Sequence, residues 1–383
     1  MGREREKAAS GQGLITLAKA ICASAIIMFL FSHITITNAS GTFFEETVTI
    51  QRLGTASESG LGLVEYGYGG GLESVAFDLS FGSGLGGNQN AQAAFNRAAN
   101  CWAEVLDDPV TVRLNLDYTS LGSGILGSAS TTMLIGGYDL VRGLVVSNAG
   151  EINNAREEAL LENLPVASEV STYMPKGFGL DGRLMLSQAN YHALGGDGFD
   201  GSDGSITFSS NFSWDFDSSD GIAPGTYDFE AVAAHEIGHV LGFVSRVDYV
   251  DWKLSQNQTD VVAMSVLDLF RFQTEDVLDV AFDFTETPRT LAPGGSHSFF
   301  QGDGSILMST GQYYGDGRQG SHWKDNLGLG LMDPTLASGQ LGYITENDLI
   351  AMDLIGWDVV PEPATLVLLG LGSVILRRKK YTA

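Results

Sequence analysis

Apolar residues follow two different periods along the central part of the chain. Between residues 91 and 106 they recur at helical spacing, which predicts an amphipathic helix, and residues 110–118 then alternate as a strand does. The same patterns predict a helix over residues 151–161, a strand over residues 204–214 and a helix over residues 262–272. A helix that leads into a strand is typical of a sheet covered by helices. We therefore expect an α/β (α+β) fold.

Two further helices have clear start signals. Thr226 can cap a helix that continues to residue 244, and Asp228 and Glu230 place negative charge in its first turn. One face of this helix is apolar and consists of Phe229, Ala233, Ile237, Val240 and Val244. The last helix begins at a capping box formed by Thr345 and Asp348. Its apolar stripe consists of Leu349, Met352 and Ile355, and it ends at Gly356, so the folded domain is expected to stop near Trp357.

The helix over residues 226–244 carries the pattern His235-Glu236-x-x-His239. His235 and His239 lie one turn apart, so both imidazoles project from one face and can bind one metal ion. A zinc ion held by three protein groups keeps a fourth position for water and lowers the pKa of that water. Glu236 lies beside that position, where a carboxylate acts as general base in amide hydrolysis. The pattern predicts a zinc hydrolase.

A third zinc ligand must come from outside the motif. In the common metzincin pattern a histidine follows three residues after the glycine, but here that position is Ser245, a poor zinc ligand. His33 lies near the N-terminal signal, which leaves His192, His297 and His322. His322 is the best candidate, because it lies in Gly-Ser-His-Trp-Lys and is followed by Leu-Met-Asp-Pro. Two carboxylates remain as alternatives: Asp248, soon after the glycine turn, and Glu275, which would make the chain a gluzincin.

The combination of these motifs resembles the leishmanolysin-like metzincins. Members of that family have His-Glu-x-x-His-x-x-Gly-Phe, a long spacer, a third histidine in a Ser-His-Trp sequence and then a Met-turn, in the order found here. The resemblance implies a metzincin-like zinc peptidase domain with a twisted mixed sheet, an active-site helix and a Met-turn in its lower subdomain. The site residues that it implies are His235, His239 and His322 as zinc ligands, Glu236 as general base and Met332 beneath the metal.

Both ends of the chain have features of processing signals. Basic residues precede an apolar run within residues 1–39, which is typical of a secretory signal peptide. Residues 359–383 contain Pro-Glu-Pro, an apolar helix too short to span a bilayer comfortably, and a basic end. This order resembles the PEP-CTERM sorting tail of Gram-negative envelope proteins. The resemblance implies export, transient membrane association through the tail, and processing by an exosortase in the envelope.

The chain between these signals divides into a glycine-rich segment and one folded domain. We expect a Gly-rich N-terminal segment over residues 40–87 and a metallopeptidase domain over residues 88–358. The upper half of that domain is expected over residues 88–244 and the lower half over residues 245–358. If the strand over residues 204–214 is a sheet edge at the cleft, an extended peptide substrate can pair with it.

The charge of the chain argues against nucleic acid as a partner, and one acidic loop is a candidate for a second metal site. The chain has 21 Lys and Arg against 46 Asp and Glu, a formal net charge of −25, which opposes nucleic acid and favours divalent cations. Cys22 lies in the signal segment, so Cys101 would have no partner for a disulfide inside the mature chain. An Asp/Gly-rich loop with Asp197, Asp200 and Asp203 is a candidate calcium site, although Asp-Gly pairs also form turns.

The sequence thus predicts a secreted or envelope-associated zinc endopeptidase that acts on peptide or protein substrates. A surface or matrix protein that binds metal without catalysis is the alternative, and Glu236 discriminates against it, because a structural zinc site gains nothing from that carboxylate. Hydrolysis of a non-peptide amide uses the same zinc chemistry and stays open.

Overall fold

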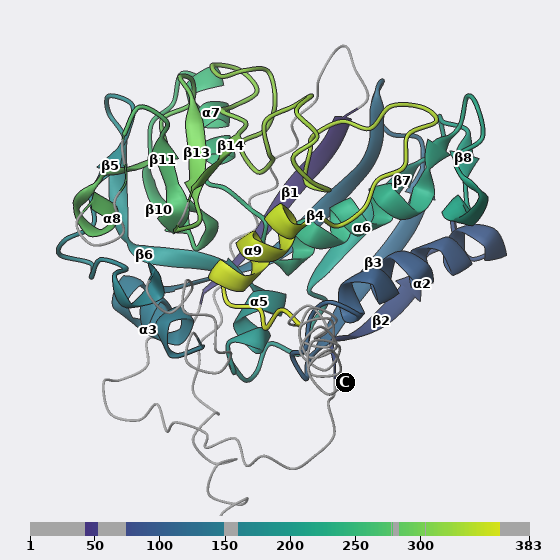
Figure 1. The fold of residues 1–383 in the computed structure, drawn as a ribbon, viewed down its shortest axis with the longest axis horizontal. Coiled ribbons are helices and arrows are strands. Elements are labelled where there is room, and N and C mark those ends of the chain that lie inside the picture. The colour runs from purple at the N-terminus through teal and green to yellow at the C-terminus, as the bar shows by residue number, and fades with distance from the viewer. Residues whose placement is uncertain are drawn as a thin grey trace, which may run out of the picture.

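A mixed sheet forms the scaffold of the structure (Figure 1). The computed structural model describes residues 43–52, 74–148, 160–276, 278, 283–302 and 304–360, with the backbone alone at 43–52 and 283. The predicted signal peptide and nearly all of the predicted sorting tail lie outside these residues. The strands of the sheet are β1 (Phe43–Arg52), β2 (Ala76–Phe81), β3 (Thr111–Thr119), β4 (Ile125–Gly137), β6 (Gly179–Ser187), β7 (Gly204–Ser209) and β10 (Val261–Ser265).

Six of these strands lie in the order β10-β6-β4-β7-β3-β2. β2, β3 and β7 are parallel to one another, whereas β4 is antiparallel to both β7 and β6, and β10 is parallel to β6. β1 pairs in parallel with β4. The predicted mixed α/β sheet is confirmed, and it includes β1 and β2 from the glycine-rich segment 40–87.

Helices and short strands make up the rest of the described chain. The helices are α2 (Gln89–Ala103), α3 (Tyr138–Asn148), α5 (Gln188–Ala193), α6 (Phe229–Leu241), α7 (Val247–Ser255), α8 (Asp283–Glu286) and α9 (Glu346–Leu354), with 3-10 turns η1 (Ser218–Asp220) and η2 (Leu267–Phe270). The short strands are β5 (Thr172–Tyr173), β8 (Trp214–Asp215), β9 (Tyr227–Asp228), β11 (Arg271–Gln273), β12 (Arg289–Thr290), β13 (His297–Phe300) and β14 (Ser305–Met308). Within the described part of the chain, no helix has both the length and the apolar sequence required to cross a membrane.

The helices α2 and α6 pack together on one face of the large sheet (Figure 1). Phe208 of β7 stacks on Phe229 of α6 with ring centroids 4.2 Å apart, and it meets Phe95 of α2 edge-on at 5.9 Å. Trp102 of α2 donates its indole N–H to the carbonyl oxygen of Ala234 in α6 over 2.9 Å. All three phenylalanine rings are buried, so α6 is fixed between α2 and the sheet.

A second, smaller sheet is built by the chain that follows α6. Its strands β11, β13 and β14 are antiparallel. In Figure 1 this small sheet lies on one side of β1 and β4, whereas α2 and α6 lie on the other side. Phe272, Phe299 and Phe300 from this sheet are buried in the core. The small sheet therefore packs on the same core as the large sheet, and the loop with His322 follows it in the chain.

Two predicted elements differ from the structure. The strand predicted over residues 204–214 ends at Ser209, and this strand, β7, lies between β4 and β3, so it is not a sheet edge. The helix predicted over residues 262–272 is wrong, because the region forms β10, η2 and β11. Its apolar residues are nearly all buried, and a short run that is buried on every side has no period that distinguishes strand from helix. The helix predicted over residues 151–161 falls almost entirely outside the described residues.

Candidate metal centre

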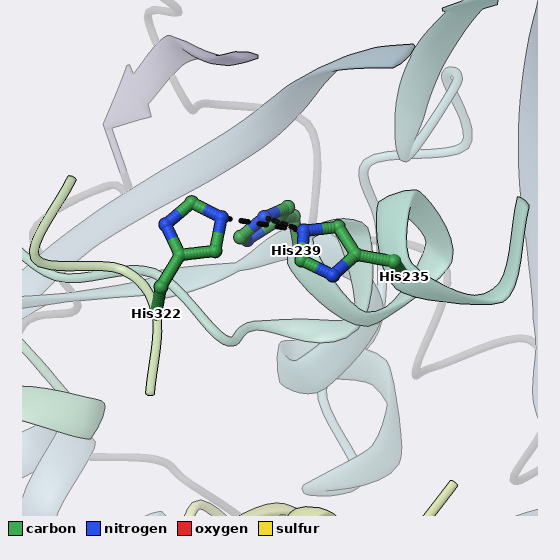
Figure 2. Close-up of side chains that lie close together, drawn as sticks. All are labelled: His235, His239 and His322. Atoms are coloured by element: carbon green, nitrogen blue, oxygen red, sulfur yellow. Dashed lines mark hydrogen bonds between the residues drawn. The ribbon is translucent and has the colours of Figure 1, made fainter. Parts of the chain in front are cut away.

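Three buried histidines from two distant parts of the chain meet beside α6 (Figure 2). The Nε2 atoms of His235 and His239 lie 3.1 Å apart, and those of His235 and His322 lie 3.2 Å apart. Each of the three side chains is 1 % exposed or less. Among the described residues this is the one group of three or more His, Cys, Asp or Glu side chains placed to hold a metal ion.

The hydrogen bonds of the three rings fix their tautomers. His235 Nδ1 lies 2.8 Å from the carbonyl oxygen of Leu331, His239 Nδ1 lies 2.9 Å from that of Phe243, and His322 Nδ1 lies 3.3 Å from that of Gln319. A carbonyl oxygen only accepts, so each Nδ1 carries the proton and donates it. Each Nε2 of the neutral rings then presents a lone pair toward the other two. Three lone pairs that converge in this way form a binding site for a cation.

Electrostatics keep the three rings neutral. Burial lowers the pKa of His239 to about 4. Burial also lowers the pKa of His235 and His322 well below the ordinary value, and the neighbouring imidazoles lower it further. Neutral imidazole is the form that binds a metal. The rings are therefore ready to bind a metal at neutral pH.

The distances from His235 Nε2 to the other two Nε2 atoms suit zinc. Ligand nitrogens at ~2.0–2.1 Å from a tetrahedral zinc ion lie about 3.3 Å from one another. The observed Nε2 separations of 3.1 and 3.2 Å are close to that value. Three imidazole ligands also leave the fourth tetrahedral position to another group.

Helix α6 places two of the histidines by its own geometry. It begins after Asp228, whose carboxylate accepts a hydrogen bond from Ala231 N over 3.0 Å, so Asp228 and not the predicted Thr226 is the N-cap. Thr226 instead hydrogen-bonds the carbonyl oxygen of Ala223. The helix ends at Gly242, which has a φ of +124° that a side chain would disfavour. Helical spacing between these two ends brings both imidazoles to one face.

The loop with His322 is held by buried charged groups. Asp248, at the start of α7, accepts hydrogen bonds from the backbone N–H groups of Gly320 and Ser321, and from the Ser321 hydroxyl over 2.6 Å. Arg271 is fully buried and donates to the carbonyl oxygens of Gly320 and Ser309. Asp248 is not in the group around the metal position, so its observed contacts are those of a support for the loop.

Ser245 occupies the position where the short metzincin pattern has its third histidine. Its backbone N–H donates to the Ser321 hydroxyl over 2.9 Å, and its own hydroxyl donates to Asp268 over 2.6 Å. The segment after α6 is thus joined to the residue that precedes His322. The contacts of Ser245 therefore tie the end of the motif segment to the distant loop that carries His322.

A second buried carboxylate organises the segment around Met332. Asp348, in the first turn of α9, accepts hydrogen bonds from Trp323 Nε1 over 2.8 Å, Leu331 N over 2.7 Å and Met332 N over 3.2 Å. It also accepts from Thr345 N over 2.8 Å, which confirms this half of the predicted capping box. The sequence revealed Asp348 only as a helix cap, because its other donors come from loops that have no periodic pattern.

Met332 lies against the motif helix. A β-carbon added at Gly238 would stand 2.5 Å from Met332 Sδ, so the sulfur occupies the space that a side chain at position 238 would fill. The carbonyl oxygen of the preceding residue, Leu331, accepts the hydrogen bond from His235 Nδ1. Met332 is fully buried beside α6.

Glu236 is fully buried between α6 and strand β4. A β-carbon added at Gly127 of β4 would lie 2.6 Å from Glu236 Oε1 and 3.1 Å from its Cγ. Gly127 therefore makes the room that the carboxylate occupies. Thr131, four residues further along β4, donates its hydroxyl to the carbonyl oxygen of His239 over 3.1 Å.

The structure does not gather the other candidate ligands into a metal site. Asp203 is buried and accepts from Arg113 N and Gln188 Nε2, whereas Asp197 and Asp200 are exposed. These three carboxylates do not form a group that could hold an ion. The remaining candidates are also separate from the three histidines: Glu275 in an exposed turn, His192 beside Gly198, and His297 beside Arg271.

Comparisons with known proteins identify the C-terminal tail. Residues 359–380 match the family model described as the PEP-CTERM protein-sorting motif. No curated protein and no solved structure gives a significant match to the chain. The motif implies processing by an exosortase. The chain is therefore an exported, cell-surface-sorted protein of Gram-negative bacteria, with a buried three-histidine cluster that can bind a metal ion such as zinc.

Proposed function

We propose that the chain is a zinc-dependent endopeptidase of metzincin type, related to the leishmanolysin-like branch with a long spacer before the third ligand. The observation that carries the proposal is the convergence of three Nε2 lone pairs from His235, His239 and His322, with Glu236 next to the first of them on α6. A structural zinc site uses four protein ligands, whereas three imidazoles and a neighbouring carboxylate are the set of a catalytic site.

The three histidines hold the metal through Nε2 and are kept in place through Nδ1. Hydrogen bonds from Nδ1 to backbone carbonyl oxygens orient each ring and strengthen its Nε2 as a ligand. When bound, zinc supplies Lewis-acid chemistry, polarising a peptide carbonyl and making water acidic enough to attack near neutral pH.

Glu236 is the general base in this proposal. Its carboxylate accepts the proton of the attacking water and passes it to the leaving amine nitrogen, so that no covalent bond to the protein forms. Burial between α6 and Gly127 restricts the position of this carboxylate, as a proton-transfer group requires. Met332 supports the helix from below by filling the space at Gly238.

The sorting tail and the charge of the chain define where the enzyme works. A PEP-CTERM motif indicates a protein that acts at the cell surface or outside it, where peptides and proteins are among the amides that a zinc hydrolase can reach. The formal net charge of −25 opposes nucleic acid as a partner. A peptide or protein substrate in the envelope or outside is the class that fits both.

Two variants on α6 test the mechanism. Zinc per chain and hydrolysis of denatured casein are measured for wild type, Glu236→Gln and Glu230→Gln. We expect about one zinc in all three, a loss of ~10²–10⁴-fold in kcat/KM for Glu236→Gln, and little change for Glu230→Gln, whose carboxylate pairs with Arg97. Zinc with no hydrolysis of a broad substrate panel by any form would favour the non-catalytic surface protein instead.

A second pair of variants tests the third ligand. His322→Ala is expected to lower zinc affinity by at least 10²-fold, because two imidazoles on one helix hold the ion weakly. His192→Ala is the matched control, since His192 lies outside the cluster and hydrogen-bonds Gly198. Equal zinc affinity in the two variants would remove His322 from the site.

A further inference from the structure

Strand β4 has different partner strands along its two edges. On one edge it pairs antiparallel with β7 from Gly127 to Thr131 and then with β6 from Met133 to Gly137. Along the other edge it pairs in parallel with β1 over ten residues, from Phe43 opposite Ile125 to Arg52 opposite Ile135. No other strand of the described chain pairs with β1. The second edge of β4 is thus covered by the N-terminal strand alone.

This edge borders the candidate metal centre. Gly127, the residue whose Cα faces the Glu236 carboxylate, is paired with Phe44 of β1. Thr131, whose hydroxyl binds the carbonyl oxygen of His239, is paired with Val48. Paired strands lie ~4.8 Å apart, so the β1 backbone runs one strand spacing from the residues of β4 that contact the motif. Figure 2 shows β1 next to β4 above the three histidines.

The pairing has the form in which proteins bind extended peptides. A peptide that adds to an exposed sheet edge gains main-chain hydrogen bonds along its length without regard to its sequence. An endopeptidase with its catalytic groups beside β4 needs such an edge to hold its substrate extended. The strand predicted for this role, β7, is internal, and β4 is the strand of the sheet that lies along the motif helix.

We propose that residues 43–52 are an inhibitory segment that occupies, in cis, the edge of β4 on which an extended peptide substrate pairs. The inference rests on the proposed function and adds its regulation. β1 is separated from β2 by residues 53–75, a glycine-rich stretch that is longer than a tight turn and that we call the tether. Because β1 belongs to the same chain, its binding is intramolecular and a substrate in solution competes with it at a disadvantage. Hydrolysis is slow until β1 leaves the edge.

The main test cuts the tether in the zinc-loaded full chain. A recognition sequence for a site-specific protease is inserted between Gly69 and Gly70, and kcat/KM for a fluorogenic peptide is measured before and after cleavage and removal of the N-terminal fragment. We expect an increase of at least 10-fold. A synthetic peptide of residues 43–52 should restore inhibition, and a scrambled peptide should not. Wild type treated with the same protease is the control.

A second variant disrupts the pairing without cleavage. Successive backbone N–H groups of a strand point to opposite edges, so in Val48→Pro/Thr49→Pro one of the two prolines removes a donor that faces β4. This variant should show a several-fold higher kcat/KM than wild type. The matched control places two prolines in the tether, Ala56→Pro/Ser57→Pro, and should leave kcat/KM at the wild-type value.

Hydrogen exchange separates this inference from the proposed function. In zinc-loaded Glu236→Gln, amides within residues 125–135 should exchange at least 10-fold faster once the fragment is removed, while zinc content and near-UV circular dichroism stay constant. Unchanged exchange, or unchanged kcat/KM in an active enzyme, would overturn the inference and leave the peptidase intact. Loss of zinc and near-UV signal on removing the fragment would show that β1 is a permanent strand of the fold, which also overturns it. Faster exchange with no hydrolysis in any form would count against the peptidase alone.

Discussion

The motif helix and the loop with His322 contribute to the same cluster by different physical means. In α6 the two imidazoles are placed by the period of the helix, and the cap at Asp228 and Gly242 at the C-terminus only define its ends. His322 lies in a segment that has no regular secondary structure. That segment is held instead by two buried carboxylates, Asp248 of α7, which binds Ser321, and Asp348 of α9, which binds Trp323.

The difference shows where a site of this kind is vulnerable. A helix distributes its stability over many backbone hydrogen bonds, so one lost contact changes the relative positions of His235 and His239 very little. Each carboxylate under the loop, by contrast, satisfies several buried donors at once, and its loss leaves all of them without a partner. Substitutions of the carboxylates that support the loop should therefore weaken metal binding. Substitutions at the N-cap of α6 should lower the stability of the fold and leave metal binding unchanged.

The largest effect is expected for Asp348→Ala. It leaves Trp323 Nε1, Leu331 N and Met332 N without their buried acceptor, at a cost of about 1–3 kcal/mol for each donor. The Leu331 carbonyl that orients His235 should shift as well. We expect a loss of more than about 3 kcal/mol in the free energy of unfolding and at least a 10²-fold weaker zinc affinity.

Chemical denaturation and zinc titration check this variant against Glu346→Ala. Glu346 is also acidic and in the first turn of α9, but it is exposed. An equal, small effect of both substitutions would mean that Asp348 acts only as a helix cap.

A smaller effect is expected for Asp248→Ala. Gly320 and Ser321 lose the carboxylate that binds them, so His322 becomes less well positioned while the two ligands on α6 keep their places. Zinc affinity should fall by ~10–100-fold, the range found for groups that position metal ligands. The control is Asp251→Ala on the same helix, which releases Tyr313 and Tyr314 and should leave zinc affinity unchanged. Direct coordination by Asp248 would instead change the number or type of zinc ligands seen by X-ray absorption.

Sequence patterns predicted the elements whose structure is determined by residues close together in the chain. Helical spacing and cap residues are enough to predict α2, α6 and α9, and β3 follows from alternation along a half-covered strand. Strand β4 was not predicted, since most of its residues are buried on both faces and no alternation remains. The partner of β4 along its second edge is also a long-range feature, because the pairing with β1 joins segments separated by more than seventy residues.

The candidate site divides in the same way. His235, Glu236 and His239 follow from one helix, and His322 followed from the scarcity of histidine and its Ser-His-Trp context. Arg271, Asp268 and Asp348 were not identified as parts of the support, because a buried charge has no signature in sequence until its donors are known. Asp248 was an alternative metal ligand in the sequence analysis. In the structure it binds Ser321, the residue before His322.

The smallest effect is expected at the cap of α6, for Asp228→Ala. The substitution removes the acceptor for Ala231 N and should lower the free energy of unfolding by about 1 kcal/mol, the usual cost of losing an N-cap. Zinc affinity should stay within about twofold of wild type, because the histidines lie in later turns and their spacing belongs to the helix itself. Asp228→Asn keeps the acceptor and should be more stable than the alanine variant in thermal unfolding. If Asp228→Ala weakened zinc binding as strongly as Asp248→Ala, the positions of the two motif histidines would depend on the cap. The contrast between two ligands placed by their helix and a third placed by buried carboxylates would then fail.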